Sequence, residues 1–231
     1  MLEMQSKKIL VITPHPDDAE SGAGGTIAKW ARQGSEITLV VCTNGNKGTA
    51  DRRMSPDQLA ETRQKEQRKA AAILGIEEVV FFDYSDQGLT DSDEFRKLLV
   101  REIRRNKPDV VITIDPERKW IRHRDHFYTG RVTLDAVFPY ARDHLAYSDL
   151  LEEGLEPHKV LDVYLWGSDD PDTFVDIDDT FDIKMDALYS HASQMSQSKE
   201  EGSIRWRERL SEYGPIVVSE LAEPFKRLKL R

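Results

Sequence analysis

The sequence predicts an α/β protein of the Rossmann-like, three-layer type, with a mostly parallel sheet between two layers of helices. Short continuous apolar runs rich in Ile and Val alternate along the chain with longer helical patterns. Such runs are typical of parallel strands that are buried on both faces. Their alternation with helices is typical of βαβ units. The chain has 231 residues, which is enough to enclose a sizeable core.

The predicted elements follow one another at short intervals up to about residue 145. Glycines after the last apolar position of a pattern, Gly34 and Gly75, mark two helix ends. The expected strands are 8–13, 36–42, 78–82 and 109–114, and the expected helices are 22–33, 57–74, 91–106 and one from about 127.

The pattern becomes looser beyond residue 145. We expect a strand near 160–166, another at 173–177 and a helix near 179–195. We expect one domain over 1–231, with a core of about 8–145 that residues 146–231 complete.

Composition excludes several classes of function. The chain has 33 Lys and Arg against 42 Asp and Glu, a net charge of -9, which argues against nucleic acid or an anionic membrane as partner. No apolar run approaches the ~18 residues that span a bilayer, and the first residues lack a secretory signal. Cys42 is the single cysteine, so no internal disulfide is possible and a reducing, cytoplasmic location is expected.

Two groups of polar residues follow predicted strands. His15, Asp17 and Asp18 come directly after the first strand, and His123 and His126 follow the strand at 109–114. Ligands of open α/β sheets bind at the carboxyl ends of the strands. One carboxylate at a helix start is an ordinary N-cap, but two carboxylates and a histidine exceed that role.

These residues suit a metal site. Catalytic zinc usually has three protein ligands and one open position. His15, Asp18 and one of His123 and His126 make such a set, and Asp17 is left to face the open site. Spacing does not decide which of the two later histidines binds the metal.

Two other patterns point to less specific roles. The glycines at 22–25 suggest a dinucleotide fingerprint, but its last glycine would fall at Ile27, so close helix–sheet packing explains them better. Arg63 and Glu66 are, on spacing alone, an ion pair on a solvated helix face.

The motifs PHPDDAE, GGTIA and RHRDH, in this order, resemble the LmbE-like (PIG-L) family of metal-dependent N-acetylglucosaminyl deacetylases. Five shorter motifs extend the resemblance over nearly the whole chain: TNGNKG at 43–48, RQKE at 63–66 followed by AA and LG, DQGL at 86–89, HASQ at 191–194 and AEPF at 222–225.

This resemblance implies a function and a role for each site residue. It implies a Rossmann-like hydrolase that removes the N-acetyl group from a GlcNAc-containing small molecule or glycoconjugate. The implied zinc ligands are His15, Asp18 and His126, although iron, cobalt or nickel could replace zinc. Asp17 would be the general base, and protonated His123 would stabilise the oxyanion. Arg63 and His191 would help to line the substrate pocket.

Two departures from the family pattern and three alternatives remain. Arg124 replaces the usual proline of the second histidine motif, and Ile121 stands where some relatives carry tyrosine. A zinc amidase or esterase for a non-sugar substrate, a nucleotide-binding domain and a metal-holding binding module are the alternatives. The interrupted glycine pattern disfavours the nucleotide-binding domain, and intact Asp17 and His123 argue against the binding module.

We also expect a homo-oligomer, with the apolar segment 163–166 as part of its surface.

Overall fold

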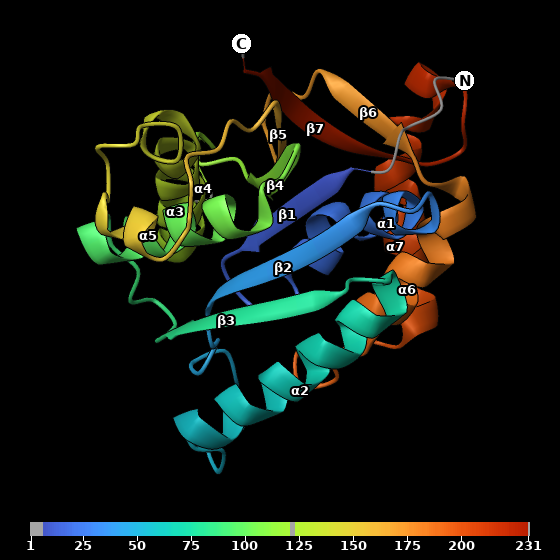
Figure 1. Ribbon diagram of the computed structural model, residues 1–231. Helices are drawn as coiled ribbons and strands as arrows, with labels where there is room; N and C mark the ends of the chain where they lie inside the picture. Colours follow the sequence, from blue (N-terminus) through green and yellow to red (C-terminus); the bar gives the residue numbers. More distant parts are fainter. Residues whose placement is uncertain (1–6, 121–122, 231) are drawn as a thin grey trace.

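A seven-stranded mixed sheet forms the centre of the computed structural model, which describes residues 7–120 and 123–230 (Figure 1). The strand order is β3-β2-β1-β4-β5-β7-β6, in which β1 to β5 run parallel to one another and β7 is antiparallel to β5 and β6. The strands are β1 (Lys8–Thr13), β2 (Glu36–Thr43), β3 (Glu78–Tyr84), β4 (Val110–Ile114), β5 (Asp162–Trp166), β6 (Thr173–Asp176) and β7 (Ala222–Lys229). The predicted α/β class with a mostly parallel sheet is confirmed.

Helices cover both faces of this sheet. In Figure 1, α1 and α2 lie on one face with α6 and α7, while α3, α4 and α5 lie on the other. The α-helices are α1 (Asp18–Arg32), α2 (Pro56–Leu74), α3 (Asp93–Asn106), α4 (Arg124–Asp135), α5 (Asp149–Glu152), α6 (Phe181–Tyr189) and α7 (Lys199–Ser211). Short 3-10 or π-helical segments occur at Ala136–Tyr140, Asp178–Thr180 and Gly214–Val217.

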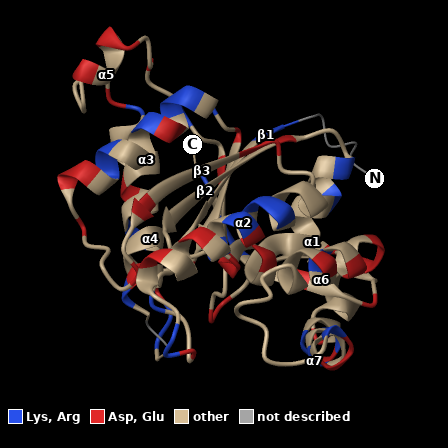
Figure 2. Ribbon diagram, turned by 90° about the horizontal axis from the view of Figure 1, so that it is seen from below, with Lys and Arg blue, Asp and Glu red and all other residues tan. Residues whose placement is uncertain are grey.

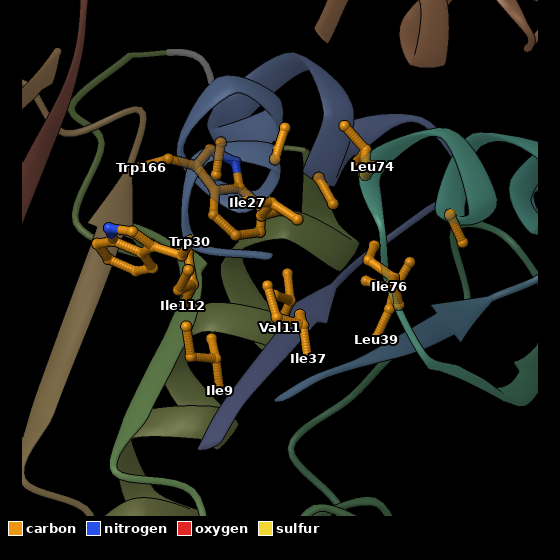
Figure 3. Packing of buried hydrophobic residues seen from close by; sticks show 14 of the residues in the cluster. Ile9, Val11, Ile27, Trp30, Ile37, Leu39, Leu74, Ile76, Ile112 and Trp166 are labelled. Atoms are coloured by element: carbon orange, nitrogen blue, oxygen red, sulfur yellow. The ribbon is translucent and has the colours of Figure 1, made fainter. Parts of the chain in front are cut away.

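Alternate residues of the central strands enter two separate apolar clusters. Val11 of β1 packs with α1 and α2, as Figure 3 shows together with Ile37 and Ile112. Leu10 and Ile12 of the same strand pack with α3 and α4 on the opposite face. Burial on both faces explains why the strands are continuous apolar runs in the sequence.

The C-terminal region departs most from the predicted elements. Helix α7 and strand β7 were not predicted from the sequence. Their sequences, KEEGSIRWRERLS and AEPFKRLK, are rich in charged residues and carry no continuous apolar run. Helix α6 ends at Tyr189, well before the predicted residue 195.

Helix α1 begins at Asp18, four residues before the predicted start. Asp18 and Glu20 occupy its first turn, where negative charge interacts favourably with the helix dipole. The acidic segment is therefore part of the helix, and Asp17 is its N-cap residue.

Segment 163–166 is interior to the sheet. Its residues form β5 between β4 and β7, and all four are buried. It therefore gives no support to a surface between subunits.

Figure 2 shows acidic and basic residues interspersed along α2, α3 and α7. Within the described residues, no helix is both long and apolar enough to cross a bilayer.

The position of β1 beside β4 creates the topological switch point of the sheet. From β1 the chain passes outward to β2 and β3, and it then returns to β4 on the other side of β1. Open α/β sheets bind ligands in the crevice at such a point, beyond the carboxyl ends of the strands. His15 follows β1, and α4 with His126 follows β4.

Candidate functional site

Three donor atoms converge at the switch point. His15 Nδ1 lies 2.9 Å from Asp18 Oδ2, and His126 Nε2 lies 3.2 Å from each of these atoms. Tetrahedral zinc with bonds of about 2.0–2.1 Å holds its ligand atoms about 3.3 Å apart. The donor set, two imidazole nitrogens and one carboxylate oxygen, therefore fits a divalent transition metal in both chemistry and spacing.

The second nitrogen of His15 is held by carboxylates on the opposite side. His15 Nε2 lies 3.1 Å from Asp125 Oδ2 and 3.2 Å from Asp86 Oδ1. Burial lowers the pKa of His15, but hydrogen bonds to Asp125, Asp18 and Asp86 outweigh it and raise the pKa to about 11. A carboxylate on the far nitrogen is the usual way in which proteins orient a metal-binding imidazole.

Asp125 is itself anchored by the backbone. Its Oδ1 accepts a hydrogen bond from Leu89 N at 3.0 Å, and its Oδ2 accepts one from Gln87 N at 2.6 Å. Burial raises its pKa, but the hydrogen bonds from His15, Leu89 and Gln87 lower it further, with a net lowered pKa. This carboxylate therefore fixes His15 to the turn that follows β3.

His123 lies beside the three donor atoms. It is the N-cap residue of α4, and its Nδ1 accepts a hydrogen bond from Asp125 N at 3.2 Å. Its ring centroid is 4.7 Å from that of His15 and 5.1 Å from that of His126. It also belongs with these two histidines to a group whose donor atoms lie within 4.8 Å of one another.

The environment of His123 favours its neutral form. Burial and the charges of His15 and His126 lower its pKa. Because Nδ1 accepts a backbone hydrogen bond, the neutral ring carries its proton on Nε2. The protonated form expected from the sequence is therefore disfavoured at neutral pH, although the neutral ring still offers a hydrogen-bond donor.

Asp17 stands next to the donor set in a strained conformation. Its φ of 103° lies in the left-handed region, which is costly for a residue other than glycine. Its amide donates to Gln67 Oε1 at 3.2 Å, and its Oδ2 accepts from Arg63 Nη2 at 3.2 Å. Burial raises the pKa of Asp17 to about 7; the charge of Asp18 acts in the same direction, and Arg63 opposes it.

Arg63 connects the loops that follow two strands. Besides Asp17, it donates to the backbone oxygens of Pro16 at 2.5 Å and Gly45 at 3.1 Å. Gly45 has a φ of +62°, and a Cβ there would lie 2.4 Å from the Arg63 guanidinium. Arg63 is thus a buried residue beneath the site, where it holds the carboxylate of Asp17.

His191 is also buried rather than open to a cavity. Its Nε2 lies 3.5 Å from Glu20 Oε2, and both side chains are completely buried. Glu20 Oε1 in turn accepts a hydrogen bond from Gln67 Nε2 at 2.6 Å. Burial lowers the pKa of His191, but Glu20 and Asp17 outweigh it, so the pKa is raised. The raised pKa favours the cationic form of His191, and that charge lowers the pKa of Asp17.

A cavity of about 480 Å³ opens beside the donor set. Asp18 and His126 line one end of it. Its other lining residues come mainly from the strand ends and the C-terminal region, among them Ser21, Arg118, Trp166, Asp169, Trp206, Arg209 and Tyr213. A polar cavity with several aromatic side chains is suited to a small hydroxylated ligand.

A family model described as "GlcNAc-PI de-N-acetylase" (PIG-L) matches residues 10–137, more than half of the chain. The chain belongs to the PIG-L family. The matched range includes all three donor residues, Asp17 and His123. The resemblance inferred from the motifs is therefore confirmed.

Individual PIG-L relatives extend this similarity over most of the chain. The diacetylchitobiose deacetylase of Thermococcus kodakarensis is 36% identical over 83% of this chain and 71% of its own length. A 1D-myo-inositol 2-acetamido-2-deoxy-alpha-D-glucopyranoside deacetylase of Streptomyces griseus is 31% identical over 71% of this chain and 56% of its own. The solved N,N'-diacetylchitobiose deacetylase of Pyrococcus horikoshii, complexed with an inhibitor, has a TM-score of 0.91 and 32% identity over 97% of this chain and 85% of its own.

Several residues of this PIG-L site escaped the sequence analysis. Asp86 and Asp125 were given no role, although a carboxylate after β3 and one between two histidines both fall at the carboxyl edge of the sheet. Gln67 looks like an ordinary helical residue in the sequence, and Glu20, the last residue of the motif PHPDDAE, was given no role of its own. The departure at Ile121 lies outside the described residues. Arg124 donates from Nε to Leu89 O at 2.9 Å, and α4 begins at this residue without the usual proline.

Proposed function

We propose that this protein is a metal-dependent deacetylase that hydrolyses the N-acetyl group of a small GlcNAc-containing substrate. One observation carries the proposal: the donor atoms of His15, Asp18 and His126 converge at 2.9–3.2 Å beside a cavity, and the carboxylate of Asp17, the residue before Asp18, is held by Arg63. The deacetylase activities of the named PIG-L relatives supply the reaction class.

Zinc is the metal that we propose for His15, Asp18 and His126, and iron, cobalt and nickel suit the same ligands. When bound there, a zinc ion would polarise the amide carbonyl and lower the pKa of water from 15.7 to roughly 7. His15 must lose its Nδ1 proton to bind a metal. Hydrogen bonds to carboxylates raise the pKa of His15 to about 11, so protons compete with the metal for this nitrogen. Metal affinity should therefore weaken as the pH falls.

Asp17 is the proposed general base. Asp18 is committed to the metal, so a second carboxylate is needed to accept the proton of the attacking water. Among the described residues, Arg63 is the charged side chain that hydrogen-bonds Asp17, and burial raises the pKa of this carboxyl above its ordinary value, which makes it a better proton acceptor. The same carboxyl group then returns the proton to the departing amine.

His123 is the proposed oxyanion partner. Its neutral ring can donate from Nε2 to the oxygen that becomes negatively charged in the tetrahedral intermediate. The backbone N–H of Asp125 fixes the ring at Nδ1, so the donor is oriented before substrate binds. This arrangement needs no positive charge on His123.

The sugar ring is placed in the cavity beside Asp18 and His126. Trp166, Trp206 and Tyr213 offer aromatic faces, and Ser21, Arg118 and Asp169 offer polar groups for hydroxyls. We propose that Arg63 and His191, which the sequence analysis assigned to the pocket lining, act on Asp17 from beneath the site.

Acetate release and metal content test this proposal together. The purified protein, loaded with zinc, should hold about one ion per chain and release acetate from N-acetylglucosamine or its dimer. Bound metal with turnover of only non-sugar amides or esters would favour the amidase or esterase alternative. Bound metal with no turnover of any amide would favour a binding module.

We also propose a homo-oligomer and a cytoplasmic location. Trp120 and Val218 are more than 90% exposed, and such apolar side chains suit a homo-oligomer. Light scattering at micromolar concentration tests this, and a monomeric mass would contradict it. The single buried cysteine fits the proposed cytoplasmic location.

A further inference from the structure

A buried ion pair lies outside the proposed metal centre. Lys184 of α6 and Glu223 of β7 are 2.8 Å apart, between Nζ and Oε1, and their side chains are at most 1% exposed. Both residues lie beyond the range 10–137 that the family model matches. Neither has a role in the proposed reaction.

Both side chains bind the backbone of α1. Lys184 Nζ donates to the carbonyl oxygens of Glu20 at 3.0 Å and Ser21 at 2.7 Å. Glu223 accepts from Gly25 N at 3.0 Å and from Thr26 N at 2.7 Å. Backbone groups within a helix normally bond to each other. An ion pair that contacts residues 20–26 therefore ties α6 and β7 to the N-terminal half of α1.

Small residues permit this close approach. A Cβ at Gly24 would lie 3.1 Å from Lys184 Cγ, and Gly25 O accepts a hydrogen bond from Thr180 Oγ1 at 2.8 Å. The glycines at 24 and 25 thus have a packing role against the C-terminal region, in agreement with the close packing predicted for this motif.

Short hydrogen-bonded steps connect the pair to the proposed site. Ser21, whose carbonyl binds Lys184, donates from its amide to Asp17 O at 3.0 Å and from Oγ to Asp18 O at 3.0 Å. Lys184 thus fixes Ser21, which in turn hydrogen-bonds the backbone oxygens of Asp17 and Asp18. The ring of Trp206, which lines the cavity, lies 4.6 Å from Lys184 Nζ.

Stability alone gives a poor explanation for such a pair. Replacing a buried ion pair by apolar residues of similar volume is often neutral or stabilising, whereas removal of one partner is strongly destabilising. Burial lowers the pKa of Lys184 despite the opposing charge of Glu223. An apolar pair, however, could not form the hydrogen bonds that Lys184 and Glu223 make to the backbone of α1.

We propose that Lys184 and Glu223 are positioning residues, which hold the N-terminal half of α1 so that Asp18 meets His15 and His126 and Asp17 stays against Arg63. This inference rests on the proposed function, because it assigns the metal to these three residues. Through Trp206, the same pair supports the cavity wall.

Metal affinity and thermal stability of matched variants separate positioning from simple packing. The variants are Lys184→Met, Glu223→Gln and the apolar pair Lys184→Met/Glu223→Leu, with Lys199→Met of the exposed Lys199–Asp186 pair as control. The readouts are the zinc dissociation constant by chelator competition, Tm, and kcat and KM for acetate release.

We expect the apolar pair to melt close to the wild-type temperature yet to bind zinc ~10-fold or more weakly, the usual scale for residues that orient metal ligands. Its kcat should fall more than its KM rises. The control should match wild type in every readout. Wild-type zinc affinity in any folded variant of the pair would overturn the proposal.

A measurement on the unmodified protein covers the case in which no variant folds. If the pair and the metal act on one turn, zinc should slow hydrogen exchange at the amides of Gly25 and Thr26, because coupling between two sites is reciprocal. Unchanged exchange there would overturn the proposal. Failure of the proposed function is distinct: it would appear as wild-type protein that binds no zinc or releases no acetate.

Discussion

The part of the chain up to α4 and the part from β5 onward contribute to the proposed site in different ways. The first part supplies every donor atom and both proposed catalytic groups, from the loops after β1 and β4 and from the first turns of α1 and α4. The second supplies one wall of the cavity through Trp206, Arg209 and Tyr213, and the buried pair beneath α1.

The two parts therefore have different roles: one carries the reactive groups, and the other shapes the cavity. Reactive groups sit at the ends of parallel strands, where the topology alone brings distant loops together. The shape of the cavity depends on α7 and on the antiparallel strand β7, which close one side of the sheet. Changes in the first part should therefore abolish chemistry, and changes in the second should tune binding and geometry.

The largest expected effect is loss of the metal from the first part. His126→Ala removes one of three ligand atoms, so the protein should lose zinc and all measurable acetate release. His123→Ala, on the same helix, is the matched variant: it should keep zinc and lose turnover. Metal analysis after dialysis decides between them. If the His123 variant loses zinc and the His126 variant keeps it, then His123 is the metal ligand and His126 is the catalytic group.

The next effect is loss of the base without loss of the metal. Asp17→Asn keeps the shape of the side chain but cannot accept a proton, so kcat should fall by ~10² or more while zinc remains bound. Asp57→Asn, at the exposed start of α2, is the control and should leave kcat unchanged. Near-normal turnover by the Asp17 variant would place the base elsewhere.

A smaller effect is a shift in the pH profile. Asp17 acts as a base only when it is ionised, so kcat/KM falls as the pH drops through its pKa. Arg63 lowers that pKa, and its removal in Arg63→Gln should move the acidic limb to higher pH, by about one unit or more. Lys65→Gln, which removes an exposed cation from the same helix, should leave the limb in place.

An unshifted limb in Arg63→Gln would mean that the titrating group on the acidic side is not Asp17. The absolute position of the limb is also informative. Burial raises the pKa of Asp17 to about 7. A bound cation favours the ionised form of this carboxylate, so the metal-loaded protein should show its acidic limb below that value.

The smallest expected effect comes from the second part. Trp206→Ala removes an aromatic face from the cavity, and KM should rise by up to ~10-fold with a smaller change in kcat. Ile204→Ala, on the exposed side of α7, is the control. A fall in kcat that exceeds the rise in KM would contradict a role in substrate binding and would assign Trp206 to support of the site instead.

The sequence by itself determined the parallel core of the sheet and the residues at its carboxyl edge, but not the antiparallel strand β7. Continuous apolar strands such as β1 report burial on both faces, and His15, Asp17 and Asp18 directly follow one. Ordered family motifs added the roles. These signals are local, because each depends on neighbours a few residues apart.

Only the tertiary structure decided which groups meet. The contacts of His126 with Asp18, of Asp125 with His15, and of Lys184 with the backbone of Glu20 join residues more than 100 positions apart. The sequences of α7 and β7 are rich in charged residues and carry no continuous apolar run, so their places depend on packing against the rest of the fold. A buried lysine or glutamate looks like a solvated one in sequence, since burial and partners are properties of the assembled fold.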